Sequence, residues 1–587
     1  MKINIILSNN QIITIDTFID EQVVSDEFKV YTAENLLMIV KSHNNSEGIS
    51  RFLAKENLNI EMIESNLLEL KKNASFVAIT KENRFVIGGD FNNYNPIYYL
   101  EKDEELFISF YPELIASFTK QKLNRTYFAL RIVNFDTVYP FTELTPWDNV
   151  KLVNSRKILV SLEGQVKQVF PWRSNGENKT IAGVAGELSK NLNSVLRKYL
   201  ENQPKISADL SGGLDSTSLC YFCKNLGIEL NTVFLSPEDG ADSDVVWSER
   251  ASRDVSAEHV VLPYSSTVTL STLDPIAIYN ALPFGPSESF RYINLVRKII
   301  EIGLENDISI HINGHGGDEL FGPLSTMAWS LYHSNYPNRI RNLYGFARLN
   351  KFNLFKFFKS LVDNSSLSDN LRDLNCQEVE QVDFDIKYSS KWISTLSVES
   401  FVTQTARDLI TRCATSYAEK DIESYSDDKS IHKILEEIEI HSLLQRDLNA
   451  MVPNDRSFRF LSPYTNYDIV ESALKYNIDE RFNAKVTKPM LAEIRPSSMS
   501  LEYFQRRDKG EYSESTFTEY SNRKKILQKI FSEECLIYKL GLVDRVDLLE
   551  SLNKFSADGE LLENVMRIQI IEYWLRGYCE SEGEYEI

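Results

Sequence analysis

A glycine-rich turn between an apolar stretch and an amphipathic helix constrains this chain more than any other feature. The hexapeptide Ser211–Ser216 reads Ser-Gly-Gly-Leu-Asp-Ser. Gly212 and Gly213 let the backbone approach an anion closely, and successive N–H groups at a helix N-terminus face that anion. The two serines, Ser211 and Ser216, add hydroxyl donors. The turn therefore predicts a phosphate site at the end of a strand.

An acidic residue stands inside this turn. Asp215 would repel a phosphate unless a cation lay between them, so its presence indicates Mg²⁺. No Gly-Lys-Ser or Gly-Lys-Thr follows, so this is not the long lysine-containing loop of P-loop nucleotide triphosphatases. The turn instead resembles the pyrophosphate loop of ATP pyrophosphatases, which split ATP between its α and β phosphates and leave an acyl adenylate.

Composition narrows the function classes. A chain of 587 residues is too long for one core and predicts two or three domains. Its formal net charge of −20 argues against nucleic-acid binding, because phosphate backbones need clustered Lys and Arg. No apolar run is long enough for a membrane helix or a signal segment, and six scattered cysteines predict no disulfide framework. We expect a cytoplasmic protein.

The hydrophobic pattern changes near residue 180. Residues 1–175 are β-rich, with helical periodicity near 33–42 and 60–71, and the polar stretch 174–179 is a candidate linker. From Ile181 helices and strands alternate, which predicts a doubly wound parallel sheet with ligands at its strand ends. Beyond Phe321 the pattern is mostly helical. The predicted domains are therefore 1–175 and 181–587.

A second glycine-rich turn follows the last apolar strand of the alternating region. Its sequence, residues 313–322, is Asn-Gly-His-Gly-Gly-Asp-Glu-Leu-Phe-Gly. Carboxylates from two strand ends can jointly hold Mg²⁺ on a triphosphate, so Asp215 and Asp318 are the predicted metal ligands. The predicted nucleotide-binding residues belong to the two turns: Ser211, Gly212, Gly213, Asp215, Ser216, Asn313 and Gly314.

Together these motifs resemble the asparagine synthetase superfamily. Residues 181–587 are similar to its synthetase domain, a doubly wound adenine nucleotide α-hydrolase-like domain of the ATP-pyrophosphatase type with a helical C-terminal part. Residues 1–175 resemble its Ntn-type glutaminase domain, an α+β fold, through Gly89-Asp90 and the run from Asn95 to Tyr99. Such glutaminases use a cysteine at position 2, whereas this chain has Lys2 and no cysteine before Cys220. We expect a degenerate domain that releases no ammonia from glutamine.

The residue inside the second turn distinguishes branches of that superfamily. Asparagine synthetases have Glu where this chain has His315, and β-lactam synthetases have Tyr. The Gly-His-Gly-Gly-Asp form resembles the lasso-peptide macrolactam synthetases, or lasso cyclases. That resemblance implies an ATP-dependent enzyme that adenylates an Asp or Glu side chain of a leader-free core peptide. It then joins this carboxyl group to the peptide's own N-terminal amine, releasing AMP and pyrophosphate.

The C-terminal half carries further similarity to lasso cyclases. The runs Lys488–Leu491 and Arg506–Ser513 resemble their Lys-Pro-Leu-Leu and Arg-Arg-x-Lys-Gly-x-Tyr-Ser stretches, while Thr465-Asn466 replaces the usual Leu-Asp. Lys509 would stabilise the α-phosphate and the departing pyrophosphate. Lys488 is interpreted as an ordinary surface lysine. His315 is assigned to orienting the amine or accepting its proton, with a structural role in capping the turn as the alternative.

Several alternatives stay open at this level. An ammonia-dependent or β-lactam-type ligase of a small amino acid is the rival enzyme, and a non-catalytic peptide-binding relative is the second rival. The resemblance implies a precursor peptide, a leader peptidase and a leader-binding protein as partners, and leaves open membrane contact through a transporter. Residues 338–360 carry six bases and no acid, which fits either a solvated helix face over a buried aromatic side or a docking surface for an acidic peptide, a protein or a membrane. Cys220 and Cys223 are interpreted as packing residues.

Overall fold

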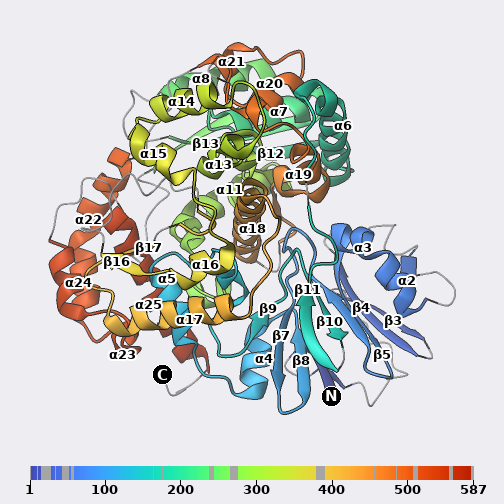
Figure 1. The fold of residues 1–587 in the computed structure, drawn as a ribbon, viewed down its shortest axis with the longest axis vertical. Helices are drawn as coiled ribbons and strands as arrows, with labels where there is room; N and C mark the ends of the chain where they lie inside the picture. Colours follow the sequence, from blue (N-terminus) through green and yellow to red (C-terminus); the bar gives the residue numbers. More distant parts are fainter. Residues whose placement is uncertain are drawn as a thin grey trace. The chain divides into compact units, whose positions relative to one another are not determined.

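The chain packs into two units, each of which is described by itself (Figure 1). Unit 1 comprises Met1–Arg173, Pro283–Gly285 and Glu582–Ile587, and unit 2 comprises Ser174–Leu282 and Pro286–Ser581. The computed structural model describes residues 2–8, 11–14, 28–33, 35–42, 52–53, 58–162, 164–174, 176–236, 243–264, 275–378, 391–394, 396–453, 456–483, 485–506, 513–553 and 560–582. Among these residues no helix combines the length and hydropathy needed to cross a membrane.

Unit 1 contains two sheets. The first has the order β2-β1-β8-β7-β9, with β1 (Lys2–Ser8) parallel to β8 (Glu105–Ser109) and its other neighbours antiparallel. Its remaining strands are β2 (Gln11–Thr14), β7 (Tyr98–Lys102) and β9 (Lys151–Leu152). The second sheet is antiparallel, with the order β11 (Gln165–Val169), β10 (Ile158–Leu162), β6 (Phe85–Gly88), β5 (Ala74–Thr80), β4 (Leu36–Ser42) and β3 (Lys29–Ala33).

The two sheets of unit 1 face each other across one apolar core. Ile3 and Ile5 of β1 pack there with Val77 and Ile79 of β5. The outer face of the second sheet is covered by α2 (Ile60–Ser65) and α3 (Leu67–Asn73), and α4 (Pro112–Thr119) packs on β7 and β8 of the first sheet. The result is a helix–sheet–sheet–helix arrangement. Its likeness to a glutaminase stays a prediction.

One expectation for unit 1 is wrong. Residues 33–42 are not a helix, because Leu36–Ser42 forms strand β4. The first five residues of this strand are all buried, since one face packs in the core between the sheets and the other packs beneath α2 and α3. A strand buried on both faces shows a continuous apolar run without alternation, which periodicity cannot separate from a buried helix.

Unit 2 is built on a five-stranded sheet in which every pairing is parallel. The strand order is β14 (Glu258–Pro263), β13 (Glu229–Ser236), β12 (Lys205–Asp209), β15 (Ile310–Ile312) and β18 (Arg459–Leu461). The predicted parallel sheet with helical connections is confirmed. β18 was missed, because three residues after a long helix give too short a pattern to recognise.

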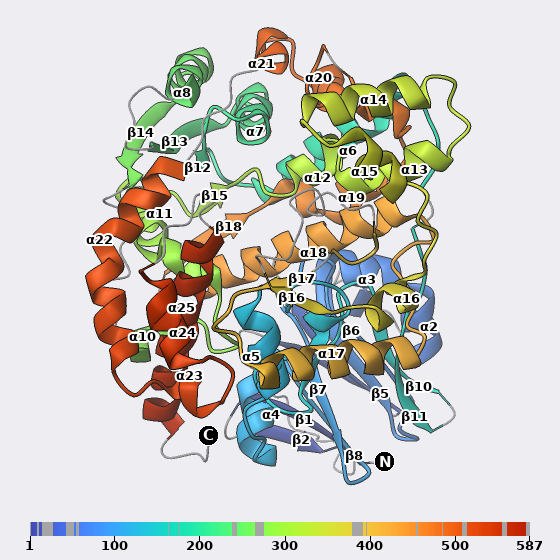
Figure 2. The same cartoon turned by 60° about the vertical axis from the view of Figure 1, so that its left-hand side comes forward.

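The chain reverses direction across this sheet between β12 and β15. From β12 it passes through α7 (Leu214–Asn225), β13, α8 (Ser243–Val255) and β14, and it then returns to place β15 on the other side of β12. α7 and α8 lie on one face of the sheet and α11 (Ile293–Glu305) on the other (Figure 2). Such a switch point leaves a crevice outside the carboxyl ends of the two central strands.

The rest of unit 2 is mostly helical, as expected. α18 (Lys429–Ala450) is a long helix whose N-cap, Asp428, accepts hydrogen bonds from the N–H groups of Ser430 and Ile431. α6 (Ile181–Tyr199) begins in the same way at Thr180. The further main helices are α10 (Pro275–Ala281), α12 (Gly317–Phe321), α13 (Ser325–His333), α14 (Arg339–Leu349), α15 (Leu354–Ser360), α16 (Leu367–Arg372), α17 (Gln404–Glu419), α19 (Tyr467–Ala473), α20 (Pro489–Ile494), α21 (Glu502–Gln505), α22 (Ser513–Ser532), α23 (Leu536–Lys539), α24 (Arg545–Ser551) and α25 (Glu560–Glu582).

The cysteine pair on α7 packs as interpreted. Cys220 and Cys223 are both free and buried. Burial raises the pKa of the Cys223 thiol to about 12 and raises that of Cys220 as well, so both stay protonated and unreactive near neutral pH.

Candidate active site

The first glycine-rich turn joins β12 to α7. Gly212 has φ +74°, and a Cβ there would lie 2.5 Å from the carbonyl oxygen of Asp244, so only glycine fits. The Ser211 and Ser216 hydroxyl groups lie 3.0 Å apart, and the Gly213 N–H donates to Ser211 Oγ at 3.3 Å. The turn is thus closed by its own side chains, with the N-terminus of α7 beginning at Leu214.

The second glycine-rich turn joins β15 to α12 and lies directly against the first. A Cβ on Gly314 would come within 2.7 Å of the Ser216 backbone nitrogen, and one on Gly317 would overlap the Asp215 carboxylate. Since β12 and β15 are parallel neighbours in the sheet, both turns follow the carboxyl ends of their strands on the same side of the sheet. Gly314 is therefore required by the close approach of two backbones, and Gly317 by the close approach of the Asp215 side chain.

Asn313 shapes the second turn from within. Its side-chain amide donates to Gln445 Oε1 at 3.1 Å, and its Oδ1 accepts from the Ser462 hydroxyl at 2.5 Å and from the His315 N–H at 3.3 Å. The side chain is buried. It was predicted to bind nucleotide, but these contacts engage it in holding the turn to α18 and to the end of β18.

The structure brings Asp215 and Asp318 together through Lys488. The Lys488 Nζ lies 2.5 Å from Asp215 Oδ2 and 2.6 Å from Asp318 Oδ1. Its side chain is 6% exposed, so its interpretation as a surface lysine is wrong. The backbone holds it there, because Lys488 has φ +52° and caps α20, which starts at Pro489. No local feature of the sequence marks this lysine as buried, because its partners Asp215 and Asp318 lie far away in the chain.

Charge and burial oppose each other in this triad. Burial raises the pKa of Asp215, with a further contribution from Asp318, while Lys488 pulls it down again. Burial would lower the pKa of Lys488, but the two carboxylates raise it above its usual range. Lys488 is therefore a cation held between two acidic side chains.

The donor set fits a divalent cation with phosphate. Asp215 Oδ1 is buried and has no hydrogen-bond partner within the described ranges, while the Asp318 side chain is 65% exposed. Those ranges hold no group of three or more His, Cys, Asp or Glu side chains with metal-ligand geometry. Mg²⁺ on a triphosphate commonly takes one or two carboxylates and completes its shell with phosphate and water oxygens. Asp215 and Asp318 would hold it, and it would neutralise the leaving pyrophosphate.

His315 lies beside a second histidine. Its ring stacks on that of His441 from α18, with centroids 5.6 Å apart, and His441 Nε2 lies 3.2 Å from Glu319 Oε2. Burial, with a smaller contribution from the charge of His441, lowers the pKa of His315 to about 4. Burial also opposes charging of His441, but Glu319 outweighs it and raises the pKa. His315 is thus neutral near pH 7, with its buried Nδ1 unpaired among the described residues. His441 was given no role from the sequence.

Two other histidines pack as expected. His311 on β15 is buried, accepts from the Ser207 hydroxyl at 2.9 Å and donates to Asp209 at 3.0 Å. His259 on β14 lies 2.8 Å from Thr232 Oγ1. Both rings are engaged by strand neighbours, which supports a structural role.

Lys509, the predicted catalytic lysine, lies outside the described residues, whereas Arg506 is described. Arg506 donates to the Gly212 carbonyl at 2.9 Å and pairs with Asp244 at the start of α8. Its guanidinium also lies 5.5 Å from the centroid of the Trp247 ring. This arginine attaches the segment that ends at residue 506 to the first glycine-rich turn.

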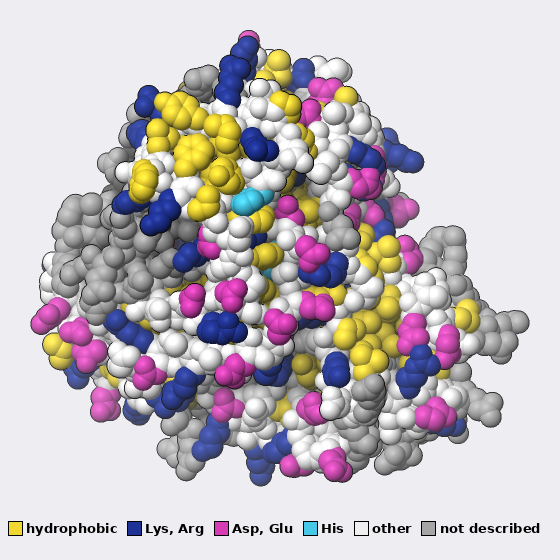
Figure 3. Space-filling model, viewed as in Figure 1, with side chains coloured by type: hydrophobic (Ala, Val, Ile, Leu, Met, Phe, Trp, Pro, Cys, Tyr) yellow, Lys and Arg dark blue, Asp and Glu magenta, His cyan; other side chains and the backbone are white. Residues whose placement is uncertain are grey.

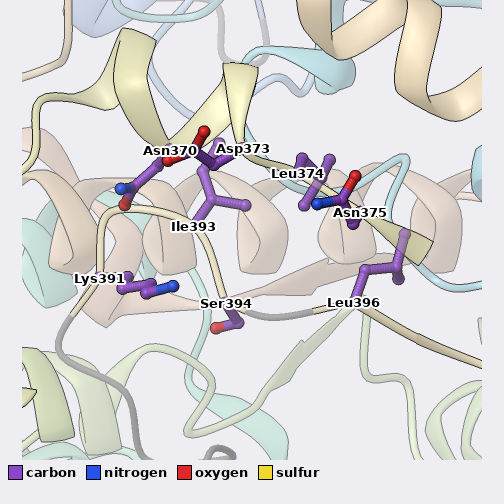
Figure 4. Close-up of a pocket in the computed structure, with 8 residues that line it drawn as sticks. All are labelled: Asn370, Asp373, Leu374, Asn375, Lys391, Ile393, Ser394 and Leu396. Carbon is purple, nitrogen blue, oxygen red and sulfur yellow. The ribbon is translucent and has the colours of Figure 1, made fainter. Parts of the chain in front are cut away.

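A pocket elsewhere in unit 2 contains none of these residues (Figure 4). It is lined by Asn370 of α16, by the residues that follow this helix, by residues that precede β17 (Leu396–Val398) and by the first residue of that strand. Its lining lacks paired carboxylates and glycine-rich turns, so it offers no competing phosphate site.

Comparison with known proteins agrees with this geometry. Residues 187–576, well over half of the chain, match the family model of asparagine synthase. No curated protein matches. Among solved structures, the NH3-dependent NAD synthetase from Campylobacter jejuni in complex with a nitrate ion is 12% identical, with 32% of this chain and 81% of that chain covered and a TM-score of 0.18. The chain belongs to the asparagine synthase family, which supports an ATP-dependent ligase that forms an amide bond.

Proposed function

We propose that the protein is an ATP-dependent peptide cyclase of the lasso-peptide type. The observation that carries the proposal is the convergence of Asp215 and Asp318 on Lys488 at two abutting glycine-rich turns. That arrangement suits a triphosphate, and the family suits amide formation. The Gly-His-Gly-Gly-Asp turn and the run from Arg506 to Ser513 add the similarity to lasso cyclases.

The first step is activation of a carboxyl group. A carboxylate oxygen of an Asp or Glu side chain in the core peptide attacks the α-phosphorus of ATP, and the bond to the bridging oxygen breaks to release pyrophosphate. The N–H groups at the start of α7 face the phosphates, while Lys488 supplies a fixed positive charge beside both carboxylates. Lys509 is proposed to stabilise the α-phosphate.

The second step is attack by the peptide's own N-terminal amine on the acyl adenylate. The amine nitrogen bonds to the carbonyl carbon, AMP leaves, and one proton is released. With its pKa near 4, His315 is a weak base, and taking a proton from a free α-ammonium of pKa ~7.8 would cost about 5 kcal/mol. The amine must therefore arrive neutral, and the neutral His315 ring is assigned to orienting it through a hydrogen bond. The adduct is more acidic and loses its proton more easily.

The experiment follows both products. The protein is incubated with ATP, Mg²⁺ and synthetic peptides that have a free N-terminus and an internal Asp or Glu. We expect AMP, pyrophosphate and a peptide lighter by one water. ADP formation would contradict the adenylation step. Consumption of ammonia with free aspartate, but of no peptide, would instead make the protein a small-molecule amide ligase.

The proposal carries partners with it. A precursor peptide is the substrate, and its leader must be removed before the N-terminal amine is free. A leader peptidase and a leader-binding protein are therefore the expected partners. The test is cyclisation of the full precursor, which requires the peptidase, against cyclisation of the leader-free peptide, which does not.

A further inference from the structure

The basic and aromatic segment 338–360 forms two short helices, α14 and α15, with a buried side. Leu343 and Ala347 of α14 pack with Phe357 of α15 and with Leu331 of α13. The interpretation as a buried aromatic side is therefore correct for the inner residues. We call the opposite, exposed side of α14, α15 and the following Val362 the α14–α15 surface.

Large apolar side chains project from the α14–α15 surface. Ile340 is 51% exposed, Tyr344 49%, Phe355 78% and Val362 54%. Ile340 and Tyr344 are one helical turn apart on α14, so they lie on the same face. Figure 3 shows apolar side chains gathered over α14 and α15 on an open face of unit 2. Phe355 exposes a larger fraction of its surface than any other described large apolar residue.

The same surface is positively charged. Residues 338–360 contain six bases and no acid in a chain whose net charge is −20. The exposed ones lie on both helices and on the turn between them: Arg341, Arg348, Lys351, Lys356 and Lys359. Basic side chains border the apolar group in Figure 3. The local field is thus opposite in sign to that of the protein as a whole.

We propose that the α14–α15 surface binds an anionic lipid bilayer. Phe355, Ile340 and Tyr344 enter the boundary between headgroups and acyl chains, because this removes their apolar surface from water. The bases lie at the level of the lipid phosphates, where their long aliphatic stems follow the apolar side chains inward and their charges meet the anions. The protein then sits on a membrane without crossing it.

A bilayer fits this surface better than an acidic peptide or protein does. An acidic peptide needs a hollow that orders its backbone, whereas Ile340, Tyr344 and Phe355 are about half exposed or more and project outward. The bases surround the apolar group instead of lining one side of it. An apolar group surrounded by bases matches a bilayer with anionic headgroups. The negative charge of the bilayer is spread evenly in its plane, so it complements the bases however the protein is rotated about the membrane normal.

The test is co-sedimentation of the full-length protein with vesicles. One set is phosphatidylcholine alone and the other is phosphatidylcholine mixed with phosphatidylglycerol, each at physiological and at high salt. We expect binding only to the anionic vesicles, weakened by salt. Phe355→Ser should weaken it several-fold, and the combination Arg348→Glu, Lys351→Glu and Lys359→Glu at least about tenfold.

Matched variants separate a specific surface from net charge. Lys190→Glu, Arg253→Glu and Lys298→Glu reverse three exposed bases elsewhere on unit 2, and Val546→Ser removes an exposed apolar side chain from α24. These should bind vesicles as the wild type does, and thermal unfolding checks that every variant is folded. Failure of the wild type to bind anionic vesicles, or equal loss in both triple variants, overturns the proposal. Binding of an acidic polyglutamate peptide without vesicle binding would assign the surface to a protein partner.

Discussion

Each unit contains a buried lysine that lies close to an aspartate, Lys71 near Asp90 in unit 1 and Lys488 beside Asp215 in unit 2, and the two pairs differ in what their polar atoms contact. In unit 1 the Lys71 ammonium donates to the carbonyls of Gly89 at 2.5 Å and Lys157 at 3.0 Å. Asp90 accepts from the Ser75 hydroxyl at 2.9 Å and from three backbone N–H groups of the turn that follows it. Both side chains tie backbone segments together.

In unit 2 the corresponding groups face one another instead of the backbone. Lys488 pairs with two carboxylates, Asp215 keeps a buried oxygen with no partner among the described residues, and Asp318 is largely exposed. Buried polar atoms are normally paired, so an unpaired one beside exposed charge indicates a place for a ligand. The comparison shows that burial of charge does not by itself locate a site; at Asp215 the site is indicated by a buried, unpaired oxygen together with the neighbouring exposed Asp318 and the two glycine-rich turns.

Neutralising each of the two aspartates should give the largest difference between the two units. Asp215→Asn should lower ATP–pyrophosphate exchange about a thousandfold, since the charge that would hold the cation is lost. Asp90→Asn should leave exchange per folded molecule unchanged and cost about 1–3 kcal/mol of stability, because the new amide meets N–H donors. Exchange assays and urea unfolding measure the two effects. Unchanged exchange in Asp215→Asn would refute the assigned site.

The two lysines give the next largest contrast. Lys488→Met should reduce pyrophosphate exchange about a hundredfold, because the buried cation beside the phosphates is gone. Lys71→Met should destabilise unit 1 by about 1–3 kcal/mol through two unsatisfied carbonyls and leave exchange per folded molecule intact. If both variants lost exchange equally at equal stability, the distinction between the two regions would fail.

A smaller effect separates the two proposed chemical steps. His315→Ala should leave pyrophosphate exchange within a few-fold of wild type, while amide formation falls between about tenfold and a hundredfold. The reason is that His315 is assigned to the amine and not to the phosphates. Equal loss in both assays would make His315 a residue that holds the turn.

The smallest effect is on stability in acid. The folded pKa of His315 is about 4, well below the ~6.5 of an unfolded histidine, so the unfolded state binds the proton first. Stability from this group is present at neutral pH and is lost as pH falls, by about 1 kcal/mol between pH 7 and pH 5.5. His315→Phe should flatten that slope in urea unfolding. The raised pKa of His441 acts with opposite sign, so His441→Phe should steepen it.

Local chemistry made much of unit 2 predictable. Glycine runs and alternating helices and strands predicted the parallel sheet, and the rule that parallel strands end at one edge placed Asp215 near Asp318. Lys488 was not predictable in the same way, because its burial depends on how α20 packs 273 residues after Asp215. His441 is hidden for a similar reason, since nothing in the pattern of α18 indicates which residue faces the second turn. In unit 1 the apolar run of β4 carries no periodicity that separates strand from helix.

The close contact between the two glycine-rich turns affects how a bound phosphate would order them. Gly314 rests on the backbone of Ser216, and Gly317 lies flat on the Asp215 carboxyl group. Because the two turns are in such close contact, a displacement of one turn displaces the other. A phosphate that orders one turn therefore orders the other as well. The reacting groups are then positioned by the ends of two strands, β12 and β15, together.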